Sequence, residues 1–157
     1  MLLKAEAIAQ MISTDGTLVE GTPDYDLLLE AFELVDAVNK RSLIEPTPYK
    51  HVLDITNYAS KLQLTNLIFD ERNRELMFEG KRYFDLVRRS WREGDTEYLS
   101  NKVTNKDPQT ASVVKSKMQK MDAIFWPDNL DELKVNHNLK QNAAFGSGEN
   151  GNFEHSK

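Results

Sequence analysis

Cysteine is absent from this chain of 157 residues, and both glycine (7) and proline (5) are scarce. Without cysteine there is no disulfide framework, no thiol nucleophile and no cysteine-ligated zinc site. No apolar run approaches the ~18 residues that a membrane-spanning helix needs. The net charge of −5 argues against nucleic-acid binding, because surfaces that bind nucleic acid are usually basic. The composition, 39% hydrophobic and 29% charged, is instead typical of one globular domain.

The motifs of common enzymes are also missing. The chain has no Gly-x-Ser-x-Gly nucleophile elbow, no Gly-x-Gly-x-x-Gly dinucleotide loop and no P-loop. Its three histidines, His51, His137 and His155, lack the Glu-x-x-His spacing of a carboxylate-bridged metal site. The sequence therefore predicts a protein that is not an enzyme and that binds neither a cofactor nor a metal ion.

The two ends of the chain lead to two expectations. Lys4 and Glu6 interrupt the apolar region that a secretory signal peptide would need. Residues 2–12 have helical periodicity with no N-cap before them, so we expect the chain to be cut from a larger protein. Residues 146–157 are polar and aperiodic, which predicts a flexible tail after a structured portion of residues 1–145.

Hydrophobic periodicity predicts an all-α fold, mostly helical with long irregular loops. After the helix expected over residues 2–12, Thr22 offers an N-cap and Pro23 a first helical position for a second helix over residues 25–40. Two such helices would form an antiparallel hairpin, the unit that helical-repeat proteins stack. No second copy of this pattern is present, so the sequence itself does not indicate a repeat array.

The rest of the chain is less regular. The longest periodic segment, residues 64–91, contains Gly80, and it predicts either one kinked helix or two short helices with a tight joint. Residues 94–106 are polar and mixed. We expect another helix over residues 108–121 and an extended apolar segment over residues 123–127, which ends at a proline.

Charged residues gather in the longest segment, where six of the seven arginines lie between residues 72 and 92. If residues 64–89 form one helix, several of these charges fall in a sector of about 120° and apolar residues surround them. Charges that are partly buried must be paired, and arginine suits that role. If the row is solvent-facing instead, its pairs contribute little. We predict a structural ion-pair network of Glu71, Arg72, Glu75, Glu79, Arg82, Asp85 and Arg89.

The same segment closely resembles a signature of the SusD/RagB family. The family's pattern is Glu-Arg-x-Arg-Glu-Leu, an apolar pair, Glu-Gly-x-Arg, an aromatic pair and Asp-Leu-x-Arg, and residues 71–88 match every position. Residues 138–145 are similar to the family's closing segment, although Ala143 and Ala144 replace its Pro-Gly. With the upstream hairpin, these matches touch most of residues 2–145.

The resemblance implies that the chain is the C-terminal portion of a protein built around tetratricopeptide-like hairpins, here one hairpin packed on a central ion-paired helix. Family members are surface-exposed lipoproteins of the bacterial outer membrane. They bind glycans, or in some members peptides, and help deliver them to a TonB-dependent transporter without catalysis. The lipoprotein signal and its acylated cysteine are absent from this chain.

Aromatic side chains are the candidates for ligand contacts, because sugar rings stack on aromatic faces while polar groups bind their hydroxyls. The candidates are Trp91, Tyr98 and Trp126, and each could instead pack in the interior. Trp91 and Tyr98 are favoured because small and polar residues surround them. The sequence leaves one alternative open, a helical protein-interaction module that docks a partner and binds no sugar.

Overall fold

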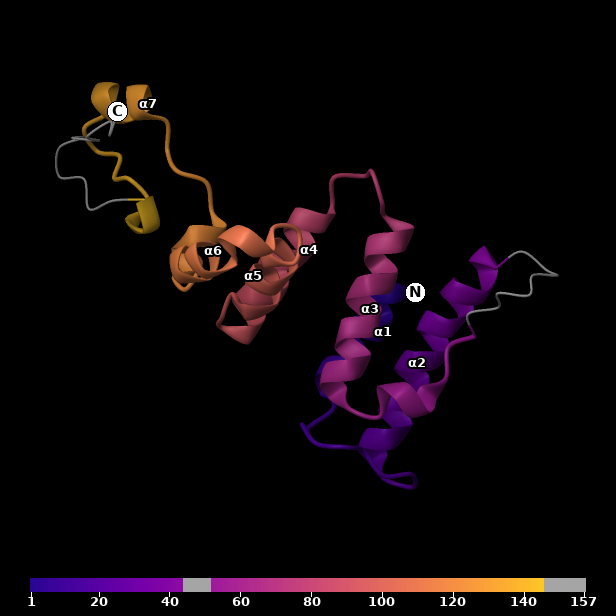
Figure 1. Cartoon of the computed structure of the whole chain (residues 1–157). Coiled ribbons are helices and arrows are strands. Elements are labelled where there is room, and N and C mark those ends of the chain that lie inside the picture. Colours follow the sequence, from indigo (N-terminus) through magenta and orange to yellow (C-terminus); the bar gives the residue numbers. More distant parts are fainter. Residues whose placement is uncertain (44–51, 146–157) are drawn as a thin grey trace. The chain divides into compact units, whose positions relative to one another are not determined.

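The computed structural model describes residues 1–43 and 52–145 (Figure 1). Within these residues the regular elements are helices and short 3-10 turns, and no strand is present, which confirms the all-α prediction. The chain divides into two compact units, unit 1 (Met1–Arg82) and unit 2 (Tyr83–Lys157). The predicted flexible tail, residues 146–157, lies outside the described residues. No described helix is both long enough and apolar enough to cross a membrane.

Unit 1 contains α1 (Leu2–Met11), α2 (Pro23–Ser42) and α3 (Lys61–Glu75), with the 3-10 turn η1 (Ile55–Tyr58) before α3. Each of the three helices contacts the other two (Figure 1). The predicted hairpin is therefore present as α1 and α2, while its tetratricopeptide-like character stays a prediction. Buried apolar side chains from all three helices form one core: Leu2, Ala5, Ile8, Ala9, Ile12, Leu18, Leu28, Ala31, Phe32, Val35, Val38, Leu64, Leu67 and Ile68.

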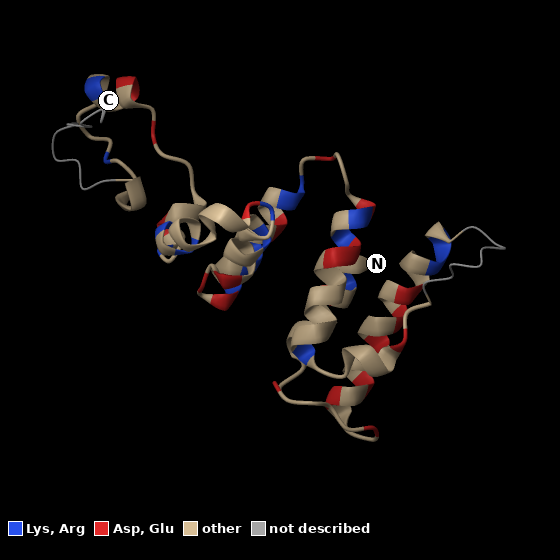
Figure 2. Cartoon of the chain, in the orientation of Figure 1, with Lys and Arg blue, Asp and Glu red and all other residues tan. Residues whose placement is uncertain are grey.

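Local sequence explains where the long helices of unit 1 begin. The Thr22 hydroxyl accepts a hydrogen bond from the backbone N–H of Tyr25 at 3.3 Å, and Pro23 takes the first helical position of α2. At α3 the Ser60 side chain accepts from the backbone N–H of Gln63 in the same way. Acidic side chains in the first turn of α2 and basic ones in its last turn oppose the helix dipole (Figure 2).

The backbone breaks in the middle of the charged segment. Helix α3 ends at Glu75, residues 76–80 form turns, and α4 begins at Arg82. Phe78 and Gly80 both have a φ of 70°, in the left-handed region where a right-handed helix cannot continue. Of the two predicted alternatives, two helices with a joint is therefore correct. The projection of residues 64–89 onto one helix is wrong, because the break separates its two ends.

After the break, the described residues form four α-helices and three 3-10 turns: α4 (Arg82–Glu93), α5 (Glu97–Thr104), η2 (Pro108–Thr110), α6 (Ala111–Lys117), η3 (Met121–Ile124), α7 (Leu130–Val135) and η4 (Ala143–Phe145). Helix α5 lies in the polar, mixed stretch of residues 94–106, for which no regular element was predicted. The helix predicted over residues 108–121 is shorter than expected and begins with the turn η2. The segment predicted to be extended becomes extended only at Phe125, after η3.

Unit 2 buries few apolar side chains. Among its described residues, the buried hydrophobic side chains are Leu99 and Ile124. Polar and charged residues share the interior with them: Asp85, Arg89, Ser90, Thr96, Ser100 and Thr104. Because buried polar groups must be hydrogen-bonded or paired, the interior of unit 2 depends on directional contacts more than the core of unit 1 does.

Asp24 ties the start of α2 to the loop that follows α1. Its Oδ2 accepts hydrogen bonds from the backbone N–H of Ser13 (3.2 Å), the hydroxyl of Ser13 (2.9 Å) and the backbone N–H of Thr14 (2.9 Å). Hydrogen bonds from Thr14 and Ser13 lower the pKa of Asp24 to about 2, from an ordinary value of 3.8. The ionised carboxylate therefore favours the folded state.

Acidification is expected to remove this contribution. Because the pKa of Asp24 is lower in the folded than in the unfolded chain, its stabilisation is present above pH 3.8 and is lost as pH falls toward about 2. Chemical denaturation at a series of pH values should show wild type more stable than Asp24→Asn near neutral pH, with the difference shrinking on acidification. Asp15→Asn, an exposed carboxylate of the same loop, is the control. A pH-independent difference between wild type and Asp24→Asn would contradict this assignment.

Strain at Phe78 gives a second prediction. The side chain is 96% exposed, so its replacement loses almost no burial, while glycine adopts a φ of 70° without a steric cost. Phe78→Gly is expected to raise the free energy of unfolding by about 0.5–1 kcal/mol. The control is Met77→Gly, at the preceding position, where φ is negative. This substitution should lower the free energy of unfolding by about 0.5–1 kcal/mol. Urea denaturation measures both, and a loss of stability in Phe78→Gly would refute the strain.

Candidate functional site

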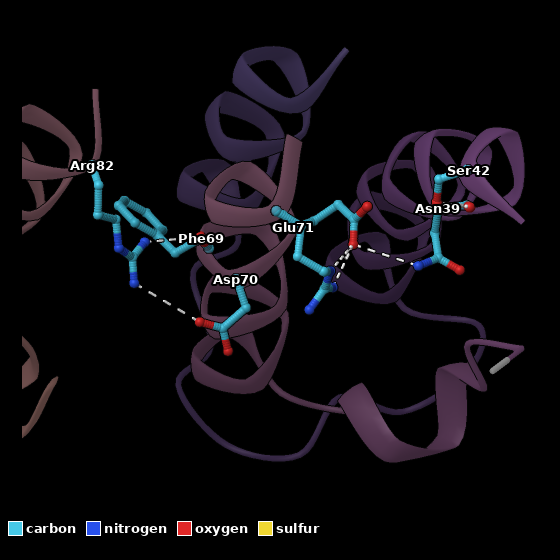
Figure 3. Close-up of polar contacts among 7 residues, drawn as sticks. Asn39, Ser42, Phe69, Asp70, Glu71 and Arg82 are labelled. Carbon is cyan, nitrogen blue, oxygen red and sulfur yellow. Dashed lines mark hydrogen bonds and ion pairs between the residues drawn. The ribbon is translucent and has the colours of Figure 1, made fainter. Parts of the chain in front are cut away.

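The buried end of the charged segment lies on α3. The Glu71 side chain is 3% exposed, and its Oε2 accepts a hydrogen bond from Arg74 Nε at 2.9 Å. The same oxygen accepts from Asn39 Nδ2 of α2 at 3.5 Å, so the carboxylate joins the two helices (Figure 3). Arg72, the next residue along α3, is buried as well. Glu71 is therefore a structural brace of unit 1 and has its negative charge paired.

Two other members of the predicted network lie outside the interior. Glu75 pairs with Arg41 of α2, and these side chains are 35% and 65% exposed. Glu79 lies in the turn after α3 and pairs with Lys81 at 2.7 Å, with both side chains about half exposed. Because Glu75 and its arginine partner are both partly exposed, the buried ion pair of this part of the network is that of Glu71.

Arg82, the first residue of α4, contacts residues of α3 across the turn that separates the two helices. Its Nη1 donates a hydrogen bond to the carbonyl oxygen of Phe69 at 3.0 Å (Figure 3). Its Nη2 lies 4.0 Å from Asp70 Oδ1. The guanidinium therefore holds the chain against α3 after the turn, and this contact needs the break, because residues 13 positions apart on one helix are too distant for it.

Helix α4 carries the second buried part of the charged row. Asp85 is buried and pairs with Arg88 at 3.1 Å. Arg89 is 1% exposed, and its Nε donates to Glu93 at 2.8 Å. The guanidinium of Arg89 also lies 3.5 Å from the ring centroid of Tyr98 on α5. The cation–π contact and the ion pair both stabilise this buried charge.

The three predicted ligand-contacting aromatics have different environments. Tyr98 is half-buried, with Arg89 against its ring and the Lys102 Nζ 5.1 Å from the ring centroid, so it acts as a packing partner of charges. Trp91 is 67% exposed and Trp126 is 80% exposed. Trp91 contacts Phe125 edge-on, with ring centroids 6.1 Å apart and an interplanar angle of 70°.

Trp91 and Phe125, with Phe84, form what we call the α4 aromatic surface. Phe84 is 68% exposed and lies seven residues before Trp91, which puts both on the same side of α4. The Tyr83 hydroxyl donates to the carbonyl oxygen of Ile124 at 2.5 Å and so fixes the segment that carries Phe125. Sequence reasoning missed Phe84 and Phe125. The seven-residue spacing of Phe84 and Trp91 was a usable signal, whereas the contact with Phe125 was not visible in the sequence.

The described residues contain no cluster of three or more His, Asp or Glu side chains that could hold a metal ion. Arg88, one turn before Trp91, keeps 42% of its side chain exposed although it pairs with Asp85. Helix α4 therefore presents exposed aromatic side chains together with a partly exposed hydrogen-bond donor.

The sequence model of the SusD family matches residues 1–145. The chain belongs to the SusD family. SusD-like protein P38 from Formosa agariphila is 30% identical over 145 residues, which are 92% of this chain and 23% of that protein. This SusD-family chain therefore spans under a quarter of the length of the curated relative that it matches. No solved structure matches it significantly. The resemblance to the SusD/RagB family is confirmed.

Two exposed arginines should differ strongly in their effect on stability. Arg74→Ala leaves the carboxylate of Glu71 buried without its cation, and we expect a loss of about 3 kcal/mol. Arg41→Ala leaves only the partly exposed Glu75, so the loss should stay within about 1 kcal/mol. Urea denaturation of both variants measures this difference. Equal losses would mean that burial of the Glu71 carboxylate does not govern the energetics of the network.

Proposed function

We propose that this SusD-family chain is the C-terminal portion of a nutrient-binding component of a bacterial outer-membrane uptake complex. The component binds a glycan or oligosaccharide and passes it to a TonB-dependent transporter. Family membership and the 23% share of the longer relative support this proposal. The longer parent protein would be a surface-exposed lipoprotein of the outer membrane.

The observation that carries the proposal is the exposed contact of Trp91 with Phe125 on the α4 aromatic surface. An aromatic face that remains open to solvent can stack against the C–H face of a pyranose ring. Phe84 extends the apolar area on the same side of α4, and Arg88 offers donors to sugar hydroxyls. Trp126 is also open to solvent and follows Phe125 directly, so it is available to a ligand that extends beyond Trp91.

Binding without catalysis fits the charged groups of the chain. The buried carboxylates of Glu71 and Asp85 each contact an arginine, and each stabilises a helical unit. We therefore assign the charged network to structure and the exposed aromatics to ligand contact.

One observation favours the alternative, a protein-interaction module that binds no sugar. Met77 (60%) and Phe78 (96%) are large apolar side chains that the turn after α3 exposes. Adjacent exposed apolar side chains are a feature of protein-binding surfaces. In this alternative the turn docks a partner protein, and the α4 aromatic surface is covered by protein instead of by a glycan.

Titration with oligosaccharides tests the proposal. The chain is titrated with neutral oligosaccharides of different linkage, with calorimetry as the readout and tryptophan fluorescence as a second signal. Trp91→Ala should weaken binding about tenfold or more, which is the effect expected of a central aromatic contact.

Phe78→Ala is the matched control, because it removes an exposed aromatic ring outside the α4 aromatic surface. It should leave binding unchanged. Binding that is equally tight in Trp91→Ala would refute the assignment of the site. A chain that binds no oligosaccharide of the series, but that co-purifies with a transporter through Met77 and Phe78, would establish the alternative.

A further inference from the structure

A groove of about 600 Å³ opens in unit 2, lined by the C-terminal part of α6, the residues that follow it, and the turns η3 and η4. Pockets that bind small molecules usually have volumes of about 300–1,000 Å³, so the groove is large enough for a small ligand. All of its lining residues lie in unit 2, and none belongs to the α4 aromatic surface. It is therefore a separate candidate site.

Hydrogen bonds connect the walls of this groove. The Asn142 side chain joins the two turns, because its Nδ2 donates to the carbonyl oxygen of Asp122 at 2.8 Å and its Oδ1 accepts from the backbone N–H of Ala144 at 3.0 Å. On the side of α6, the hydroxyl of the buried residue Thr96 donates to the carbonyl oxygen of Met118. Contacts within the chain therefore order the walls, and a ligand does not have to supply that ordering energy.

Apolar side chains from both walls line the groove. The backbone N–H of Met118 donates to the carbonyl oxygen of Val114, so these two residues lie one helical turn apart on the same side of α6. Both are half-buried, as are Ala123 and Ala144 from the two turns, and Phe145 is 38% exposed. Covering this apolar surface with the apolar body of a ligand would remove it from water, which favours binding.

The charged residues of the lining are all positive. Lys117 and Lys120 line the groove, and no carboxylate of the described residues does. Neither lysine forms an ion pair with any residue that the structure describes. Asp122, the acidic residue that is nearest to them in the sequence, is not part of the lining. An anionic group bound in this groove would therefore be attracted by two cations, and no carboxylate of the lining would repel it.

We propose that this groove binds an amphipathic anion, a molecule with an anionic head group such as a carboxylate on an apolar body of about ten carbon atoms. The head group pairs with Lys117 and Lys120, and the apolar body covers Val114, Met118 and Phe145. A free fatty acid of medium chain length has this chemistry. The site goes beyond the proposed function, because its residues and its class of ligand are different.

Nuclear magnetic resonance tests the class of ligand. The ¹⁵N-labelled chain is titrated with decanoate, below the concentration at which decanoate forms micelles. Decyltrimethylammonium is the probe with the same tail and the opposite charge, and butyrate is the probe with the same head group and a short tail. Decanoate should shift the backbone amide signals of Met118, Ala123 and Ala144 in a saturable way. Each of the other two probes should bind about tenfold more weakly or worse.

Substitution of the lysines tests the role of charge. Lys117→Gln combined with Lys120→Gln should weaken decanoate binding about tenfold, because both ion pairs with the head group are lost. The matched control combines Lys106→Gln with Lys115→Gln, which removes the same charge from two exposed lysines of unit 2 that do not line the groove. The control should bind decanoate within about twofold of wild type. All four lysines are exposed, so neither double variant should lose its fold.

Substitution of two neighbouring alanines tests the position of the site. Ala144→Glu adds bulk and a negative charge to the lining, so it should weaken decanoate binding about tenfold or more. Ala143→Glu adds the same side chain at the adjacent exposed position outside the lining, and it should leave the affinity within about twofold of wild type. Circular dichroism of both variants shows whether the helices are retained.

Five results would overturn the proposal. They are the absence of saturable shifts with decanoate, equal or tighter binding of decyltrimethylammonium, equal binding of butyrate, equal weakening in the two double lysine variants, and unchanged affinity in Ala144→Glu. Trp91→Ala separates this site from the proposed function, because it should weaken oligosaccharide binding and leave the decanoate-induced shifts of Ala123 and Ala144 intact. The two proposals can therefore fail independently.

Discussion

The left-handed backbone at Phe78 and Gly80 is the constraint on which the rest of the structure depends. A continuous helix would have kept the charged row on one side of a single rod. The turn instead ends α3 at Glu75 and lets Arg82 reach back to the carbonyl of Phe69. The charged residues before and after the break then contact different partners, and the chain forms two compact units. Local backbone geometry thus determines which partners the charged side chains contact.

Burial rather than position in the row decides what each charge contributes. Glu71 and Glu75 are one helical turn apart and both pair with arginines, yet only Glu71 lies in the interior. Its contacts include Asn39 of α2, so it links helices as well as residues of its own helix. On α4, Arg89 is buried against the ring of Tyr98. The charges that matter most for folding are therefore those that are buried and that also contact another helix.

Sequence reasoning was sufficient where the signals are local. Thr22 and Pro23 mark the start of α2, helical periodicity identifies α1 and α2, and the motif at residues 71–88 identifies the family. The all-α fold follows from the same local patterns. These features need only neighbouring residues to be recognised, so no tertiary information was required.

The remaining features depend on tertiary contacts that no local pattern encodes. Helix α5 lies in polar sequence and is held by burial of Leu99 and by the contact of Tyr98 with Arg89. The same contact places a buried guanidinium against the Tyr98 ring, although the sequence surroundings of Tyr98 are as polar as those of Trp91. The partnership of Trp91 with Phe125 spans 34 positions, and only the folded chain brings the two rings together.

The buried contact between Arg89 and Tyr98 also limits which substitutions can be accepted at these two positions during evolution. A lysine in place of Arg89 would keep the charge but lose the planar surface that lies against the ring. A smaller side chain in place of Tyr98 would leave the guanidinium without that cover. A substitution at either position therefore weakens the contact unless the other residue changes as well. Homologous sequences should therefore show these two positions varying together, as a record of their physical partnership.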